Sequence, residues 1–150
     1  GRIVTKLKDR LWVLNGKVAA IWGLSFKPGT DDIRESPSLS LVEALVQEGM
    51  KVKLHDPEAL DAFKEVRPNR KGVIEYYETP EEAAEGAYVI ILATEWECYG
   101  SVDFSIVKES MEYPLVIDGR NFLDPVLLGE AGLEYVGTGR EETFGKPRVP

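Results

Sequence analysis

Two short segments of the chain place cationic side chains close to glycines that permit tight backbone turns. The first, Gly23–Pro37, contains Lys27 and Arg34, with the aromatic Phe26 beside the lysine. The second reads Asp118-Gly119-Arg120-Asn121. A guanidinium binds phosphate through two parallel hydrogen bonds, whereas an ammonium acts as a point charge. Phe26 is suited to cover an apolar ligand face. Together the segments suggest a site for an anionic, phosphate-bearing ligand.

The same residues are also compatible with two solvated loops. Lys27 and Arg34 would then pair with neighbouring carboxylates, and Arg120 would face solvent in a turn, because charge clusters at loops are common. The acidic neighbours in question are Asp31, Asp32 and Glu35. The first segment does not read G-x-G-x-x-G, which disfavours an ordinary dinucleotide cradle. From the residues alone, the anion site and the solvated loops both stay open.

Other residues with chemical potential have weaker contexts. Asp56 stands where a carboxylate could hold a ribose, but Asp56-Pro57 also suits a helix cap, and capping is favoured. His55 is expected to be structural or exposed. Glu95 and Trp96 follow an apolar run, so they either line the site or anchor its loop. Cys98 has no activating neighbour in the sequence and is expected to take no part.

The elements that must position these residues alternate between apolar runs and helical segments. Runs at 18–24, 88–94 and 115–117, the last just before Asp118, read as continuous apolar runs, which is typical of central strands in a parallel sheet covered on both faces. Runs at 51–55 and 73–78 mix charged and apolar residues and belong nearer an edge, and 133–137 is a further short strand. This alternation predicts an α/β fold, a Rossmann-like three-layer αβα sandwich with a parallel six-stranded sheet in the order 3-2-1-4-5-6.

Helix starts are marked by a capping residue followed by proline. The side-chain oxygen accepts from an unpaired backbone N–H, and proline suits the first helical position. The pairs are Ser36-Pro37, Asp56-Pro57, Thr79-Pro80 and Asp124-Pro125, and Asp103 is a further cap. At the amino terminus, Ile3, Leu7, Leu11 and Leu14 have helical spacing that stops near Gly16. This apolar stripe is expected to be exposed unless another domain or a second subunit covers it.

Ligands of such sheets bind beyond the carboxyl ends of the strands, where the winding reverses. Here the reversal falls between the strands at 18–24 and 88–94. The loops at 25–35, 95–102 and 119–123 therefore meet at one edge. We expect Lys27, Arg34 and Arg120 to converge there.

Composition narrows the function further. The 150 residues carry a formal net charge of −8, which disfavours nucleic acid and anionic membranes as partners. A single cysteine and a single histidine exclude an internal disulfide framework and a Cys-based or His-rich metal centre. We therefore expect no metal, no membrane association and a cytoplasmic setting.

The loop residues resemble a known family. Gly23-Leu24-Ser25-Phe26-Lys27-Pro28, followed by Thr30-Asp31-Asp32-Ile33-Arg34-Glu35-Ser36-Pro37, is similar to the GLAFKPxTDDxRESP pattern of nucleotide-sugar dehydrogenases, the UDP-glucose/GDP-mannose dehydrogenase family. Later pieces agree in order: Asp56-Pro57, Ala93-Thr94-Glu95-Trp96, Asp118-Gly119-Arg120-Asn121 and Tyr135-Val136-Gly137. The similarity covers about residues 1–139 and corresponds to the carboxy-terminal UDP-binding domain.

This resemblance implies an NAD-dependent oxidoreductase of nucleotide-sugar metabolism that oxidises a sugar C6 alcohol to a carboxylate with two NAD, through a catalytic cysteine. UDP-glucose, oxidised to UDP-glucuronate, is the first expectation. GDP-mannose, UDP-N-acetylmannosamine and a freestanding non-enzymatic nucleotide-binding module are the alternatives. By resemblance, Phe26 and Lys27 contact the UDP-sugar, Arg120 contacts its nucleotide portion, and Arg34 reaches NAD.

The resemblance also implies parts that this sequence does not contain. NAD would be bound mainly by an amino-terminal domain, and the catalytic cysteine would lie in a central one, so Cys98 is not that nucleophile. We expect residues 1–15 to end the inter-domain helix, 16–139 to form the UDP-binding domain and 140–150 to be a tail. The fragment is expected to be inactive alone. Its expected partners are the UDP-sugar, the remaining domains of the same enzyme and further copies in a homo-oligomer.

Overall fold

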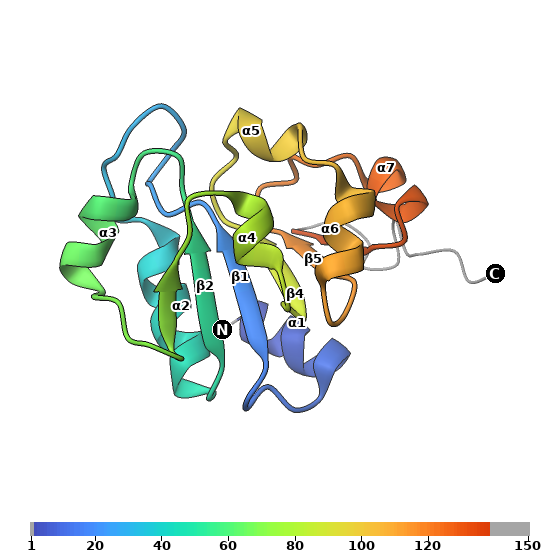
Figure 1. The fold of residues 1–150 in the computed structure, drawn as a ribbon, viewed down its shortest axis with the longest axis horizontal. Coiled ribbons are helices and arrows are strands. Elements are labelled where there is room, and N and C mark those ends of the chain that lie inside the picture. The colour runs from blue at the N-terminus through green and yellow to red at the C-terminus, as the bar shows by residue number, and fades with distance from the viewer. Residues whose placement is uncertain (1, 139–150) are drawn as a thin grey trace.

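The computed structural model describes residues 2–138 and shows strands sandwiched between helices (Figure 1). The strands are β1 (Val18–Trp22), β2 (Lys51–His55), β3 (Ile74–Tyr76), β4 (Val89–Leu92), β5 (Leu115–Asp118) and β6 (Glu134–Gly137). The helices are α1 (Arg2–Leu11), α2 (Pro37–Gln47), α3 (Leu60–Val66), α4 (Pro80–Ala84), α5 (Glu97–Gly100), α6 (Phe104–Ser110) and α7 (Pro125–Glu130). The expected tail, 140–150, lies outside the described residues.

The strands form one parallel sheet in the order β3-β2-β1-β4-β5-β6, which confirms the predicted topology. β4 and β5 are buried at every position, as expected for strands covered on both faces. β2 has half-buried residues at Lys51 and Lys53 and lies nearer the edge. The winding reverses between β1 and β4, where Ile21 is in register with Ile91.

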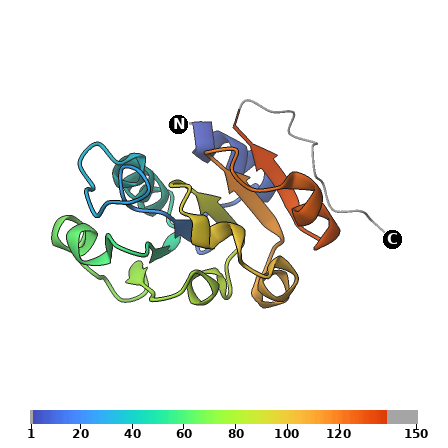
Figure 2. The same cartoon turned by 90° about the horizontal axis from the view of Figure 1, so that it is seen from above.

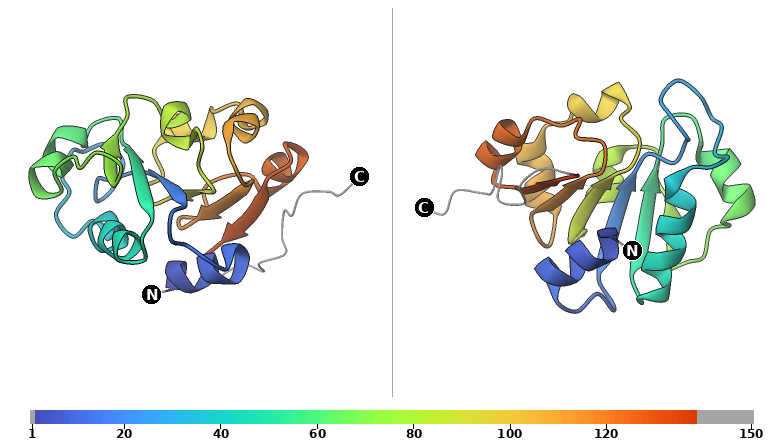
Figure 3. Two further views of the ribbon diagram at one scale, coloured as in Figure 1. Left: turned by 60° about the horizontal axis from the view of Figure 1, so that its bottom comes forward. Right: turned by 180° about the vertical axis from the view of Figure 1, so that it is seen from behind.

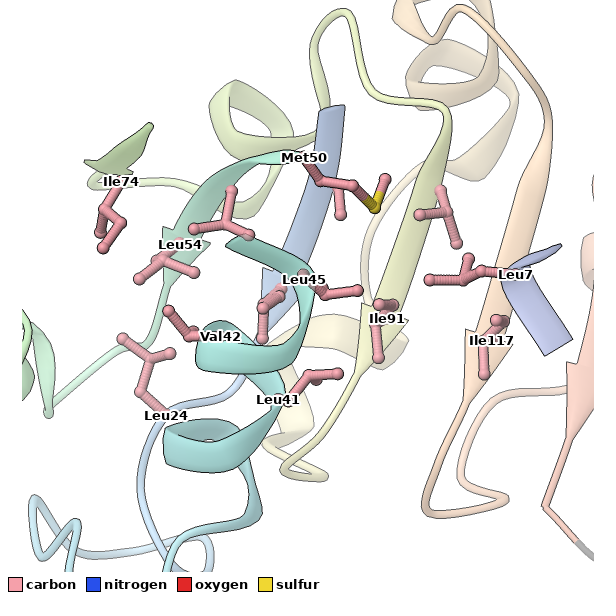
Figure 4. Close-up of a cluster of buried hydrophobic side chains, with 14 of the residues drawn as sticks. Leu7, Leu24, Leu41, Val42, Leu45, Met50, Leu54, Ile74, Ile91 and Ile117 are labelled. Atoms are coloured by element: carbon pink, nitrogen blue, oxygen red, sulfur yellow. The ribbon is translucent and has the colours of Figure 1, made fainter. Parts of the chain in front are cut away.

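Side chains alternate between two cores, one on each face of the sheet. One core joins the strands to α1, α2 and α3, and the other joins them to α4, α6 and α7. Viewed from above, these helices lie in two layers with the sheet between them (Figure 2). In the first core, Leu41, Val42 and Leu45 of α2 point toward the strands (Figure 4). Within residues 2–138, no helix is both long and apolar enough to span a bilayer.

The packing of α1 differs from the expectation for the amino-terminal stripe. Leu7 is fully buried and Leu11 is 6% exposed, so the prediction of an exposed apolar stripe was wrong. On this face α2 and α3 cover the β1–β3 half of the sheet, and α1 covers the other half (Figure 3). Leu7 lies beside Ile91 and Ile117 in this core (Figure 4).

The end of α1 also differs from the expectation. The helix ends at Leu11, earlier than Gly16, because Trp12 adopts a left-handed φ of 63°. Leu14 remains buried beyond the helix end. Its burial shows that the apolar spacing persists in the connection to β1 after the helical geometry has stopped.

Most predicted caps are present. The Ser36 hydroxyl accepts from Ser38 N, and Thr79 Oγ1 accepts from Glu82 N. Asp103 and Asp124 each accept from two backbone amides at the starts of α6 and α7. Asp56 is different, because α3 begins only at Leu60 and has no side-chain cap of its own.

The burial of Leu7 yields a stability prediction. Leu7→Ala should lower the free energy of unfolding by about 2 to 5 kcal/mol, because it removes a fully buried side chain from the core. Val13→Ala, at a 61% exposed position, is the matched control and should change it by less than about 0.5 kcal/mol. Urea denaturation followed by circular dichroism measures both. Equal unfolding midpoints for the two variants would contradict the assignment of α1 to the core.

Candidate functional site

The carboxyl ends of β1 and β4 approach each other closely at the point of reversal. Gly23 has a φ of +105°, and a Cβ there would lie 2.4 Å from Thr94 N, so only glycine fits. The Thr94 hydroxyl donates to the carbonyl oxygen of Ser25 at 2.7 Å. The loops after β1 and β4 are thus tied together at this edge, which is uppermost in Figure 1.

A buried carboxylate fixes three loops at the same edge. Asp56 follows β2 and is 1% exposed. Its Oδ1 accepts from the backbone N–H of Glu58 and Ala59. Its Oδ2 accepts from the N–H of Leu24, the N–H of Ser25 and Trp96 Nε1, at 2.7 to 3.1 Å. The predicted role as a helix cap was wrong, because α3 begins at Leu60 without a side-chain cap. Asp56 instead closes the turn ahead of that helix and joins the neighbouring loops, and protein donors occupy both of its oxygens.

The neighbours of Asp56 are structural as well. Trp96 Nε1 also donates to Ser25 Oγ at 3.1 Å, so this tryptophan anchors its loop. His55 is 3% exposed and its Nδ1 lies 3.0 Å from the Tyr99 hydroxyl. Burial lowers the pKa of His55 and raises that of Tyr99, which keeps both neutral near pH 7. Tyr99 in turn stacks on Trp22.

A second buried carboxylate shapes the loop that carries Arg120. Asp118, at the end of β5, is fully buried. Its Oδ1 accepts from Arg120 N at 3.0 Å, and its Oδ2 accepts from Leu123 N and the Tyr135 hydroxyl. Sequence reasoning missed this role. The available signal was an aspartate directly after an apolar run and before Gly119, whose N–H donates to Leu92 O at 2.9 Å.

The predicted cationic residues have different surroundings. Arg120 Nε donates to Glu95 Oε2 at 3.2 Å, so Glu95 is joined to the candidate site. Arg34 forms a forked pair with Asp32, as the solvated-loop alternative predicted. Hydrogen bonds from Arg34 lower the pKa of Asp32 to about 2. Lys27 is exposed and makes no ion pair with residues 2–138, and Phe26 is 50% exposed beside it.

A pocket of about 230 Å³ opens at this edge between α1, α2 and the ends of β4 and β5. Its apolar wall includes Ile3, Leu41 and Ile117, and its cations are Arg2, Lys6 and Arg120. Lys27 and Arg34 do not line it, so the structure does not gather all three predicted cations in one pocket. Sequence reasoning missed Arg2 and Lys6, because they join the edge only through the packing of α1.

The remaining candidate, Cys98, lies exposed on α5. Desolvation and the charge of Asp56 raise the pKa of its thiol, the opposite of what an activated nucleophile requires. Among residues 2–138, no group of three or more His, Cys, Asp or Glu side chains is arranged to hold a metal ion.

The contacts of Asp56 give a prediction for its isosteric variant. Asp56→Asn replaces one carboxylate oxygen with an amide NH2, so the oxygen of the new amide cannot serve all five donors. The free energy of unfolding should fall by at least about 2 kcal/mol, because buried donors lose their acceptor. Asp61→Asn, at an exposed position of α3, is the matched control. Thermal or urea unfolding compares the two, and equal stability would show that the Asp56 carboxylate is not needed as a clamp.

Comparison with known proteins agrees with this geometry. Residues 20–125 match the model of the UDP-glucose/GDP-mannose dehydrogenase family, UDP binding domain. The UDP-glucose 6-dehydrogenase of Pseudomonas aeruginosa is 42% identical over 83% of this chain and 28% of its own length. That of Bacillus subtilis is 38% identical over 93% of this chain and 31% of its own length. The chain thus spans less than a third of these relatives.

Solved structures give the same picture. A UDP-glucose dehydrogenase from Pyrobaculum islandicum superposes with a TM-score of 0.68 at 32% identity, over 79% of this chain and 25% of that one. An NDP-N-acetyl-D-galactosaminuronic acid dehydrogenase from Methanosarcina mazei superposes with a TM-score of 0.77 at 27% identity, over 95% of this chain and 29% of that one. With the sheet order and the motifs at its carboxyl edge, these matches show that the chain belongs to the UDP-glucose/GDP-mannose dehydrogenase family, as its UDP-binding domain.

Proposed function

We propose that this chain binds the nucleotide portion of a UDP-sugar. It would do so as part of an NAD-dependent dehydrogenase that oxidises UDP-glucose to UDP-glucuronate. The observation that carries the proposal is the anchored Arg120, which follows β5 at the carboxyl edge of the sheet, one strand beyond the reversal. Its backbone is fixed by Asp118, and its side chain lines the pocket beside Lys6. A fixed cation at the carboxyl edge of a parallel sheet is suited to a phosphate.

The loop after β1 would supply the other contacts. Lys27 is exposed and has no ion pair among residues 2–138, so its ammonium is available to an anion. Phe26 is half exposed beside it and offers an apolar surface to a base or sugar face. These two residues and Arg120 come from opposite sides of the reversal point, so a nucleotide lying across it would meet both loops.

Arg34 would serve NAD rather than the UDP-sugar. The chain has no G-x-G-x-x-G cradle after β1, so it would contribute to NAD binding only through single side chains. NAD, when bound, accepts the hydride that the sugar alcohol loses. Arg34 is 87% exposed and its partner Asp32 lies on the same loop. A solvated pair of this kind exchanges readily for a phosphate partner.

Residues 1–15 would then form the end of a helix that connects to a further domain, 16–139 the UDP-binding domain and 140–150 a tail. UDP-glucose is proposed over GDP-mannose and UDP-N-acetylmannosamine because curated relatives at 42% and 38% identity are UDP-glucose 6-dehydrogenases. The whole enzyme would act in the cytoplasm as a homo-oligomer.

Binding of UDP to the chain tests the proposed site. We expect a dissociation constant on the order of 0.1 to several mM, because the contacts of other domains are missing. Lys27→Ala and Arg120→Ala should each weaken binding toward the detection limit, since charge-assisted contacts contribute about 1.5 to 3 kcal/mol. The exposed Lys71→Ala is the charge-matched control and should bind normally.

An NMR titration measures these affinities and locates the shifted residues, and binding should weaken as salt is added. Shifts confined to residues outside 25–35 and 119–123 would refute the site. Unchanged affinity in both the Lys27 and Arg120 variants would refute it equally.

The chain alone should produce no NADH from UDP-glucose and NAD. The proposed reaction needs an activated thiol at the sugar, and the exposed Cys98 has a raised pKa. The assay follows the absorbance of NADH, and a full-length relative serves as the positive control. Turnover that Cys98→Ser abolishes would show that this cysteine is the nucleophile after all.

A further inference from the structure

Separate hydrogen bonds fix the backbone and the side chain of Arg120. Its backbone N–H donates to Asp118 Oδ1, and the preceding Gly119 N–H donates to Leu92 O. Its guanidinium is held separately, by the bond of 3.2 Å from Nε to Glu95 Oε2. The backbone contacts place the residue at the edge, and the contact with Glu95 restricts the direction of the side chain.

The donors that Arg120 retains distinguish it from Arg34. Asp32 takes both Nε and Nη2 of Arg34, which occupies one whole side of that guanidinium. Glu95 takes Nε of Arg120, and within the described chain neither terminal amino group of Arg120 makes a hydrogen bond. Two adjacent terminal amino groups can bind a phosphate through parallel hydrogen bonds. Arg120 is thus restrained without losing the donors that a phosphate needs.

Glu95 itself stands between two anchored residues. Thr94 is 1% exposed and donates to the carbonyl of Ser25. The indole Nε1 of Trp96 donates to Asp56 and Ser25, and the backbone N–H of Trp96 donates to Thr94 O at 2.9 Å. The Glu95 carboxylate therefore projects from a short turn that is fixed on both sides.

We propose that Glu95 is a positioning residue for phosphate binding, which holds Nε of Arg120 so that both terminal amino groups stay available to a nucleoside diphosphate. This inference rests on the proposed function of the site. A long side chain that is already restrained loses less conformational entropy when the ligand binds, so the entropic cost of binding is smaller. The negative charge of Glu95 acts in the opposite direction, because it repels the phosphate.

Two variants separate orientation from charge. Glu95→Ala and Glu95→Gln remove the same charge, but glutamine keeps a side-chain oxygen that can accept from Arg120 Nε. We expect the alanine variant to bind UDP about two- to tenfold more weakly than the glutamine variant. In an Arg120→Ala background the two should bind alike, because the restrained side chain is then gone.

The measurements are UDP affinities by NMR titration and the thermal unfolding midpoints of all variants. The Arg120 Nε–H resonance adds a spectroscopic signature, which should be kept in Glu95→Gln and shifted in Glu95→Ala. Matching unfolding midpoints for the two variants would assign their affinity difference to the site rather than to stability. The inference would be overturned if Glu95→Ala differed from Glu95→Gln in both UDP affinity and unfolding midpoint, and if the difference in affinity persisted in the Arg120→Ala background.

Two results separate this inference from the proposed function. Equal UDP affinity in Glu95→Ala and Glu95→Gln, with Arg120→Ala impaired, would overturn the role of Glu95 and leave the site standing. Unchanged affinity in Arg120→Ala would remove the site at Arg120 and the role of Glu95 with it.

Discussion

The carboxyl edge of this domain depends on the buried Asp56 carboxylate. Burying a charged group is costly unless hydrogen bonds replace its hydration. Asp56 satisfies this condition with four backbone amides and one indole, drawn from the loops after β1, β2 and β4. These loops follow β1 and β4, which flank the reversal of winding, and β2, which lies next to β1. One side chain therefore fixes the relative positions of segments that are far apart in the sequence.

Asp118 repeats this arrangement in the other half of the sheet. It joins the loop of Arg120 to β6 through the Tyr135 hydroxyl. The two carboxylates differ in what they leave exposed. Asp56 supports the loop that presents Phe26 and Lys27, and Asp118 supports the turn that presents Arg120. In both cases the buried carboxylate fixes the backbone of a loop, and a cationic side chain on that loop, Lys27 or Arg120, remains accessible to solvent. Under the proposed function, this division lets an acidic domain bind an anionic nucleotide.

The sequence predicted features that are set locally and missed those set by long-range packing. The caps at Ser36, Thr79, Asp103 and Asp124 need only neighbouring residues, and the strand order follows from apolar runs and their alternation. The pairing of Glu95 with Arg120 joins residues 25 positions apart, and no local pattern specifies it. The burial of Leu7 depends on which half of the sheet α2 leaves uncovered. Helical spacing shows that a face is apolar but does not identify the surface that covers it.

The position of α1 has a consequence for how the chain folds. The first helix closes over the last strands: Arg10 pairs with Glu134 at 2.9 Å across 124 positions, and Lys6 reaches the carbonyl of Gly137 across 131. Contacts of such long sequence separation form late, since closing a long loop costs entropy before any contact compensates for it. During synthesis the apolar face of α1 is fully covered only once β5 and β6 have followed β4. The domain is thus expected to reach its native core only after synthesis of its last strand, with α1 among the last segments to gain protection from hydrogen exchange.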